Sequence, residues 1–461
     1  MTRPALLLAA LLAGCAVQPD YRRPEVELPA AWRESGTRAP EAEKWWRVYS
    51  DAALERLVAE AHAANADLAA AAARVDEARA LLARSDADRL PAADASFTRG
   101  RSLSSTATGL LPPDVPRERN DYRAALAVSY EVDLWGRLAI ASQAAKADLL
   151  ASEAARETVW ITLSADVAKG YFALRALDAQ VEATRRALAL REEWLALQEK
   201  RYAGGVISEY DYRQLEAEVA AARAQLLPLQ REREAQEAAL AVLLGRSPRA
   251  VLEDPVARGA VAGAPEALLA PVVPSGLPSE LLLRRPDLVE AEHRLVAANA
   301  RVAVARSAYF PSVTLTGLLG SEAAALAGLF SGPAGVWSFA ATLAQPIFSG
   351  GRLEAEVDAA SARERQLLAR YQGAIRNAFR EVRTALSAQT RAREGFEAES
   401  ARVRALESAL RLARLRYANG LASQLEAIDA ERGLLAARIA QLEALRAQRA
   451  AVADLYRALG G

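Results

Sequence analysis

The sequence contains two copies of one unit, and this internal repeat limits what the chain can fold into. Three short motifs recur at a constant offset of 215 residues. The motifs are Gly136-Arg137, Arg201-Tyr202-Ala203 and Leu244-Gly245, which recur as Gly351-Arg352, Arg416-Tyr417-Ala418 and Leu459-Gly460. Upstream the offset is 220 residues, as from Pro91 to Pro311. The segment between Pro91 and Gly136 and the segment between Pro311 and Gly351 therefore differ in length, and each is an insert in its copy. Each copy therefore consists of a helix, an insert, a long helix, a turn and a second helix.

Two long stretches without proline predict two long helices. Residues 136–204 and 351–419 contain no proline and no cluster of turn residues. At 1.5 Å per residue, each helix would reach roughly 100 Å. The flanking helical segments are about half as long: 54–90, 206–245, 279–310 and 421–459. Two short helices stacked end to end would therefore match one long helix.

The last helix carries a coiled-coil seam. Its apolar residues follow a heptad pattern, as a coiled coil requires. These residues are Leu421, Leu425, Ile428, Leu435, Ile439 and Leu442. The one interleaved position that breaks the pattern is Arg432. Taken alone, such a seam indicates helix packing rather than a site.

Both inserts alternate between apolar and polar residues, which predicts β-strands. We expect one hairpin at about 93–131 and another at about 312–345. The apolar positions include Tyr122, Leu126, Val128, Val313, Leu315, Leu319, Trp337, Phe339 and Leu343. A soluble hairpin with one wet face would show the same alternation. If the strands lie in lipid, four cannot close a barrel, since bacterial barrels have at least eight; three copies would supply twelve.

The amino terminus resembles an export signal. One positive charge at Arg3 precedes the apolar run 5–13, which is too short to span a bilayer. The signal ends in Leu12-Ala13-Gly14-Cys15, which resembles the lipobox of bacterial lipoproteins. That resemblance implies removal of residues 1–14 and a covalent lipid on Cys15. The alternative is an ordinary signal peptide with an incidental cysteine.

Two irregular segments flank or join the copies. Residues 15–50 form an amino-terminal extension with Trp32, Trp45 and Trp46, and residues 246–278 form a connector rich in proline. Proline at this density argues against a regular helix. Their apolar residues favour packing against the helices. The first structural repeat then spans 51–245 and the second 279–461.

The composition leaves little from which to build a catalytic or metal site. Lys+Arg and Asp+Glu both number 58, so no basic excess suggests nucleic acid. Cys15 is the only cysteine, and the only histidines, His62 and His293, lie far apart in helical patterns. We expect no enzyme activity, no catalytic residue, no metal and no cofactor besides the lipid.

Four motifs make the chain similar to the TolC-type outer-membrane efflux protein family, and in particular to its lipoprotein branch that serves RND-type multidrug pumps. They are Tyr130-Glu131-Val132-Asp133-Leu134-Trp135-Gly136-Arg137, Leu283-Arg284-Arg285-Pro286-Asp287-Leu288-Val289-Glu290-Ala291-Glu292, Ala308-Tyr309-Phe310-Pro311-Ser312 and Gln345-Pro346-Ile347-Phe348-Ser349-Gly350-Gly351-Arg352. The resemblance covers essentially the whole mature chain. It implies a mainly α fold with a membrane β-barrel portion: a homotrimer with a twelve-stranded barrel and a periplasmic α-barrel, joined at an equatorial region by the connector.

The resemblance also implies two kinds of site. Two turns would form the tips that contact a periplasmic adaptor, with Arg201, Tyr202, Gly205, Val206 and Ser208 in the first, and Arg416, Tyr417, Gly420, Leu421 and Ser423 in the second. We expect Gly205 and Gly420 to adopt positive φ and the two serines to cap the following helices. A periplasmic aperture would be formed by Leu425, Asp429 and Arg432, with Arg432 pairing to Asp429 or to a neighbouring subunit. The first copy has Tyr210, Gln214 and Ala217 at the equivalent positions.

The function implied is an outer-membrane exit duct of a tripartite efflux system, lipid-anchored and extending into the periplasm. It would conduct small molecules such as drugs passively, with an adaptor and an inner-membrane pump as partners. Export of another cargo, such as a protein or a metal, is a first alternative, although no His-rich or Met-rich tract indicates a metal. A structural coiled-coil lipoprotein between envelope layers is a second. The sequence identifies neither the substrates nor the partner proteins.

Overall fold

The computed structural model describes residues 21–25, 27, 44–107, 115–258 and 284–461. The predicted signal peptide, Cys15, Trp32 and most of the connector lie outside these residues. The chain divides into two compact units. Of the described residues, the first comprises 21–25, 74–107, 115–153 and 290–372, and the second comprises 27, 44–73, 154–258, 284–289 and 373–461.

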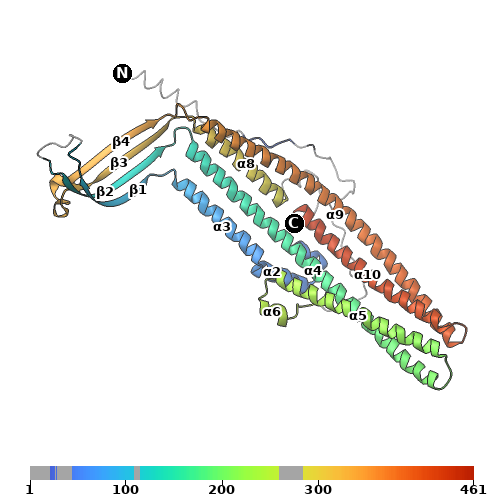
Figure 1. Cartoon of the computed structure of the whole chain (residues 1–461). Helices are drawn as coiled ribbons and strands as arrows, with labels where there is room; N and C mark the ends of the chain where they lie inside the picture. The colour runs from blue at the N-terminus through green and yellow to red at the C-terminus, as the bar shows by residue number, and fades with distance from the viewer. Residues whose placement is uncertain (1–20, 26, 28–43, 108–114, 259–283) are drawn as a thin grey trace. The chain divides into compact units, whose positions relative to one another are not determined.

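The first unit contains one antiparallel sheet of four strands in the order β1-β2-β3-β4 (Figure 1). The strands are β1 (Ala92–Leu103), β2 (Glu118–Val132), β3 (Ser312–Ala323) and β4 (Gly335–Ala344). The two expected hairpins are therefore confirmed. The central pair, β2 with β3, joins the two repeats. At Gly320 a Cβ would lie 2.3 Å from the carbonyl oxygen of Ala124, so the close approach of these strands requires glycine there.

One face of the sheet is apolar across all four strands. Directly opposite residues share a face, and the register places Leu126 opposite Leu319 and Leu319 opposite Trp337. The other face carries Ser, Thr, Asp and Glu side chains. Nothing in the described chain covers the apolar face, since Trp337 is 78% exposed and Leu319 66% exposed.

The junction between β2 and the long helix α4 (Arg137–Ala203) explains one family motif. Asp133 accepts hydrogen bonds from the backbone N–H groups of Leu138 and Ala139 at 3.1 and 2.8 Å, which satisfies donors at the start of α4. The Trp135 indole donates to the carbonyl of Pro311 at 2.6 Å. These residues therefore fix the turn from strand to helix.

The long helices match their predictions closely. Helix α4 and helix α9 (Arg352–Ala418) each contain 67 residues. The helices that follow them are α5 (Glu209–Leu243) and α10 (Gln424–Leu459). Among the described residues, no helix has both the length and the apolar character needed to cross a membrane.

The segment expected to be one helix over 54–90 is two helices, α2 (Ala52–Ala64) and α3 (Ala66–Ala87). Asn65 interrupts them because its side chain accepts hydrogen bonds from the N–H groups of Asp67 and Leu68, at 2.9 and 3.1 Å, as a cap for α3. The Asn65 amide also donates to the carbonyl of Leu243 at 2.9 Å. The end of α5 therefore meets the start of α3, as the stacking of short helices requires.

The second repeat makes the same junction with different chemistry. Helix α8 (Pro286–Ser307) begins with Pro286, which suits the first position of a helix, and residues 279–283 of the predicted helix lie outside the described residues. The Arg285 guanidinium donates to the carbonyl of Ala458 at 2.8 Å, which is the counterpart of the bond from Asn65 to Leu243. Arg285 is 6% exposed and pairs with Asp287 and Glu381 at 2.6 and 2.9 Å.

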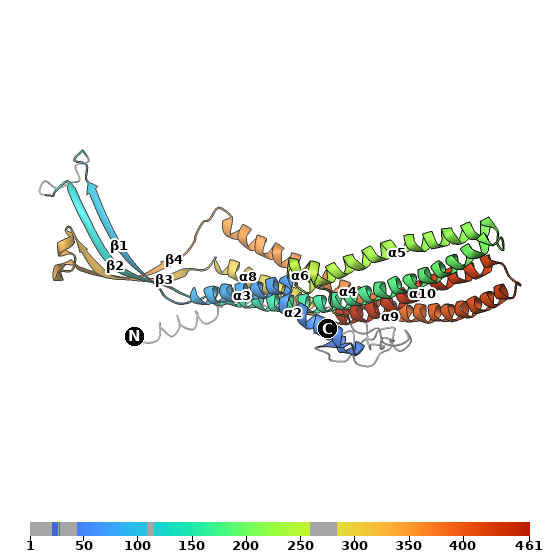
Figure 2. The ribbon, with the colours of Figure 1, turned by 90° about the horizontal axis from the view of Figure 1, so that it is seen from below.

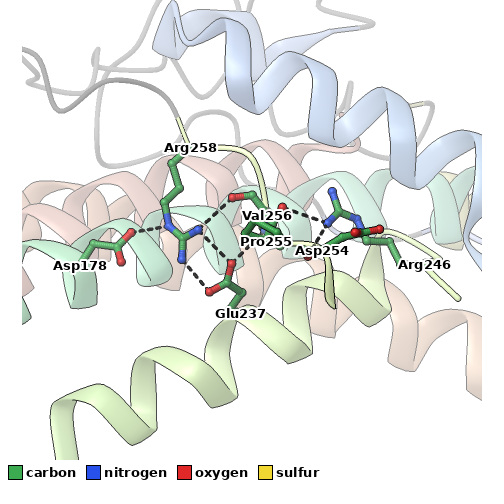
Figure 3. A network of polar contacts seen from close by, with 7 residues as sticks. All are labelled: Asp178, Glu237, Arg246, Asp254, Pro255, Val256 and Arg258. Carbon is green, nitrogen blue, oxygen red and sulfur yellow. Dashed lines mark hydrogen bonds and ion pairs between the residues drawn. The ribbon is translucent and has the colours of Figure 1, made fainter. Parts of the chain in front are cut away.

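The start of the connector is ordered, and one prediction for it is wrong. Instead of lacking a helix, it forms α6 (Pro248–Glu253), which tolerates Pro248 because proline fits the first turn. Beyond α6, the Arg258 guanidinium bonds Asp178 of α4 at 2.7 Å and Glu237 of α5 at 2.7 and 2.9 Å (Figure 3). Burial opposes ionisation of Glu237, but hydrogen bonds from Arg258 and from the Val256 N–H lower its pKa. The carboxylate therefore holds the connector to both helices.

The end of the amino-terminal extension packs against the helices of the second unit, as expected. Trp45 is 1% exposed and stacks on Tyr456 of α10, with ring centroids 5.1 Å apart. Trp46 contacts His62 and Trp160, and His62 accepts or donates a hydrogen bond with Ser164 at 2.8 Å. His62 is thus a helix-packing residue, and burial lowers its pKa.

Two glycines with positive φ offer a matched test of the stacked junction. A Cβ at Gly245 would lie 2.1 Å from the carbonyl oxygen of Ala64, whereas a Cβ at Gly205 meets nothing within 4 Å. Both alanine substitutions incur about 1–2 kcal/mol for the left-handed backbone. We expect Gly245→Ala to cost about 1–3 kcal/mol more than Gly205→Ala, because the backbone of the junction must move. Chemical denaturation of the two variants measures the difference, and equal midpoints would contradict the tight junction.

Candidate functional site at the helix turns

The turns between α4 and α5 and between α9 and α10 have the same backbone geometry. In the first, the Val206 N–H donates to Arg201 O at 2.8 Å and the Gly205 N–H to Tyr202 O at 2.9 Å. In the second, the equivalent bonds measure 2.8 and 3.0 Å. These are Schellman caps, which require a residue with positive φ. Gly205 and Gly420 supply it with φ of 69° and 71°, as expected.

The two predicted serine caps differ. Both occupy the position before the helix, with extended backbone. Ser208 accepts a hydrogen bond from the Asp211 N–H at 3.2 Å, as a capping side chain does. Ser423 makes no such side-chain bond. Ser423 is exposed, and its hydroxyl does not cap its own helix.

The turns lie side by side in both views of the second unit (Figures 1 and 2). Nine of the ten predicted tip residues are exposed. At matching positions of the two Schellman caps, Val206 is 63% exposed and Leu421 is 71% exposed. A residue at this position usually packs on its own helix, so these apolar side chains form an unusual exposed pair.

Tyr417 is the one predicted tip residue that is half-buried. Its hydroxyl accepts a hydrogen bond from Gln198 of α4 at 3.1 Å, and its ring meets Trp194 edge-on at 5.6 Å. Tyr202, its counterpart, stacks instead on Tyr212 at 5.2 Å. Tyr417 thus links the two hairpins, whereas Tyr202 stays within one.

The three predicted aperture residues lie near the start of α10. Leu425 is 44% exposed, and the Asp429 side chain is 60% exposed. Arg432 lies 3.7 Å from Asp429, the pairing considered from the sequence. It also approaches Glu218 of α5 at 3.5 Å, a partner in the same chain that was not predicted. The arginine therefore connects the second repeat to the first.

A second arginine, which is buried, approaches the same Glu218 as Arg432 does. The Arg191 side chain on α4 is 7% exposed and contacts Glu431 at 3.2 Å and Glu218 at 3.8 Å. Glu431 also faces Arg414 of α9 at 3.3 Å. The network has three arginines and three carboxylates, counting Asp429, so it is neutral. Removing one buried member leaves its partners uncompensated, which is costly.

Sequence reasoning missed Arg191, Glu218 and Glu431, because each meets its partner on another helix. One signal was present. Position 218 is equivalent to position 433 at the offset of 215, so Glu218 lies at nearly the same height on α5 as Arg432 on α10. No comparable signal indicates Arg191. The equivalent position in the second repeat is Leu406, which is apolar.

The network predicts unequal effects for two arginine substitutions. Arg191→Leu should cost about 3 kcal/mol of stability, because Glu218 and Glu431 lose a buried cation. Arg432→Leu should cost at most about 1 kcal/mol, because that side chain is 58% exposed. Denaturation midpoints of the two variants check this order. A larger loss for Arg432→Leu would show that the buried network does not hold the helices.

Comparison with known proteins places these features in a family. The chain matches the profile of the outer membrane efflux protein family over residues 57–246 and 277–461. It is 35% identical to the antibiotic efflux pump outer membrane protein ArpC of Pseudomonas putida, over 100% of this chain and 96% of the relative. It is 33% identical to the cation efflux system protein CusC of Escherichia coli O6:H1, over 98% and 97%.

A solved structure gives the same result for the fold. The CmeC outer membrane channel of Campylobacter jejuni superposes with a TM-score of 0.90 at 25% identity, covering 97% of this chain and 95% of CmeC. The duplicated helices, the sheet and the paired turns are thus shared with an outer-membrane channel. The chain belongs to the outer membrane efflux protein family and is the exit duct of an efflux system in the bacterial outer membrane.

Proposed function

We propose that three copies of the chain close one channel, with a twelve-stranded barrel in the membrane, and that the channel catalyses no reaction. The observation that carries this proposal is the sheet, whose apolar face is uncovered and whose outer strands, β1 and β4, pair on one side only. In lipid, unpaired strand edges are too costly, so such a sheet must close with others. Three copies give twelve strands.

The cargo we propose is small organic molecules, moved passively from an inner-membrane pump of the RND type. The named cargo of ArpC, an antibiotic, supports this choice at 35% identity. CusC, a cation efflux protein, makes cation export the second candidate. The two relatives have nearly equal identity to this chain, so overall similarity alone does not separate the cargoes.

The turns are the surface that we propose for a periplasmic adaptor. The exposed Val206 and Leu421 occupy matching positions, so the two turns present apolar side chains at equivalent places. The exposed guanidinium groups of Arg201 and Arg416 flank these residues. Helical hairpins of a partner could bury both apolar groups at once, and buried apolar groups surrounded by polar contacts are typical of interfaces.

For the aperture, we propose that three copies of Leu425 and Asp429 form an apolar ring next to an acidic ring. The two residues lie four apart on α10 and therefore share a face. Arg432 would hold the rings together through Glu218 of the same chain. An adaptor that binds the parted helices more tightly would shift the channel toward its open state.

We further propose that Cys15 is the mature first residue and carries a covalent lipid. The motif Leu12-Ala13-Gly14-Cys15 supports this, and several acyl chains would give stable anchoring. The intact mass of the purified protein tests the assignment. A mature chain that starts elsewhere, or lacks acyl groups, would refute it.

Single-channel recording tests the channel and its aperture together. We expect the purified protein to conduct in a planar bilayer and Leu425→Ala to raise the conductance or open probability, because a smaller side chain widens the apolar ring. Tyr210→Ala, at the equivalent position of the first repeat, is the matched control and should change neither. A protein that inserts without conducting would favour the structural lipoprotein.

A crosslink from Ser423 tests the docking surface. A photoreactive residue at this exposed position should capture a periplasmic adaptor in intact cells, identified by mass spectrometry. The control is the same residue at Ser247, which caps α6 and lies away from the turns along the chain. Capture of sister subunits alone from position 423, or the same adaptor from both positions, would contradict the docking assignment.

A further inference from the structure

The apolar face of the sheet ends in basic residues at one end only. Beyond the row that pairs Phe97 with Ala124, the same face continues with Arg99 opposite Tyr122 and Arg101 opposite Asn120. Both guanidinium groups therefore belong to the apolar face. This end of the sheet carries the hairpin connections, whereas the other end leads into the helices.

The position of Arg99 along the strand matches the height of a membrane. On β2, Tyr122 lies ten residues from Val132, which belongs to the last apolar row at the helix end. Ten residues span about 33 Å along a strand. A tilt of roughly 35–45° reduces this span to about 25 Å, the height of the apolar band of an outer-membrane barrel. Arg99 and Tyr122 therefore fall where the acyl chains end and the headgroups begin.

The charges at this level are incompletely balanced. Arg101 pairs with Glu118 at 2.5 Å. Arg99 lies over the Tyr122 ring, 5.8 Å from its centroid, and within the described chain it contacts no carboxylate. Arg119, Asp121, Arg123 and Glu322 belong to the opposite face by register. The apolar face therefore ends with two cations and one anion.

The second hairpin shows that this basic end is not a general feature of the sheet. Residues 323–351 contain no charged side chain. On the apolar face, the excess of positive charge is confined to the first hairpin, next to the exposed apolar residues Phe97 and Leu126. An arginine with an aromatic neighbour at this level suits an anionic headgroup, because guanidinium binds phosphate oxygens in pairs.

We propose that Arg99 and Arg101 bind the phosphate groups of anionic lipids in the outer leaflet. This inference rests on the proposed function, in which the sheet is part of a membrane barrel with its helices in the periplasm and its hairpins outside. A lipid fits better than free phosphate, because its acyl chains would cover the apolar residues below while its headgroup meets the arginines.

The test measures binding of fluorescent lipopolysaccharide, a phosphorylated outer-leaflet glycolipid, to the purified full-length protein in a nonionic detergent. The double variant Arg99→Gln/Arg101→Gln should bind about twenty-fivefold more weakly. Each basic side chain near an anionic lipid surface contributes a factor of about five to the affinity, and the two factors multiply. Arg119→Gln/Arg123→Gln, which removes the same two charges from the opposite face of the same strand pair, is the matched control and should bind like the wild type. Inorganic phosphate should not displace the lipid.

Unchanged binding in the double variant would overturn the proposal. An equal loss in Arg119→Gln/Arg123→Gln would also overturn it, because the effect would then follow net charge rather than the face of the sheet. Displacement by inorganic phosphate would assign the arginines to a free anion instead. Conductance of the same preparations reports the proposed function separately: lipid binding without conductance would refute the channel, and conductance without selective lipid binding would refute only the lipid site.

Discussion

The structure depends on how two short helices are joined to match one long one. The last carbonyl groups and first N–H groups of a helix have no partner within it, and burying them unpaired is costly. In the first repeat, Asn65 satisfies both sides, with its carbonyl oxygen on α3 and its amide on Leu243. In the second, Arg285 reaches Ala458. These bonds therefore satisfy polar groups at the places where one short helix follows another.

The two repeats have the same backbone geometry at their turns but different side chains at the predicted site. Both turns use the same Schellman cap and expose an apolar residue at the position after its glycine. Only the second carries Leu425, Asp429 and Arg432, and of these Arg432 contacts Glu218 of the first repeat. Duplication therefore supplied the frame, and divergence of a few side chains supplied a contact between unlike copies. The contact is not duplicated in this chain, because Ala217 stands at the position equivalent to Arg432 and Gly433 at the position equivalent to Glu218.

Much of the fold could be predicted because its signals are periodic. Uninterrupted stretches without proline gave α4 and α9, and alternation gave the strands together with the face of each residue. The break at Asn65 was missed, although the offset of 220 places Ala66 opposite Pro286, and within a helical pattern a proline fits best in the first turn. Contacts such as Arg191 with Glu431 could not be predicted, because a buried ion pair between helices leaves no spacing in the sequence. The helix α6 was missed because proline was weighed by density rather than by position.

The use of a neutral amide in one junction and an ion-paired guanidinium in the other makes the two halves tolerate substitution differently. Asn65 joins its helices through uncharged hydrogen bonds, so its loss would leave polar groups unpaired but no charge. Arg285 is 6% exposed, so the loss of Asp287 or Glu381 would leave a buried cation with less compensation. A chain that is nearly symmetric in backbone is therefore asymmetric in its tolerance of change: at the second junction, three charged residues must be kept together.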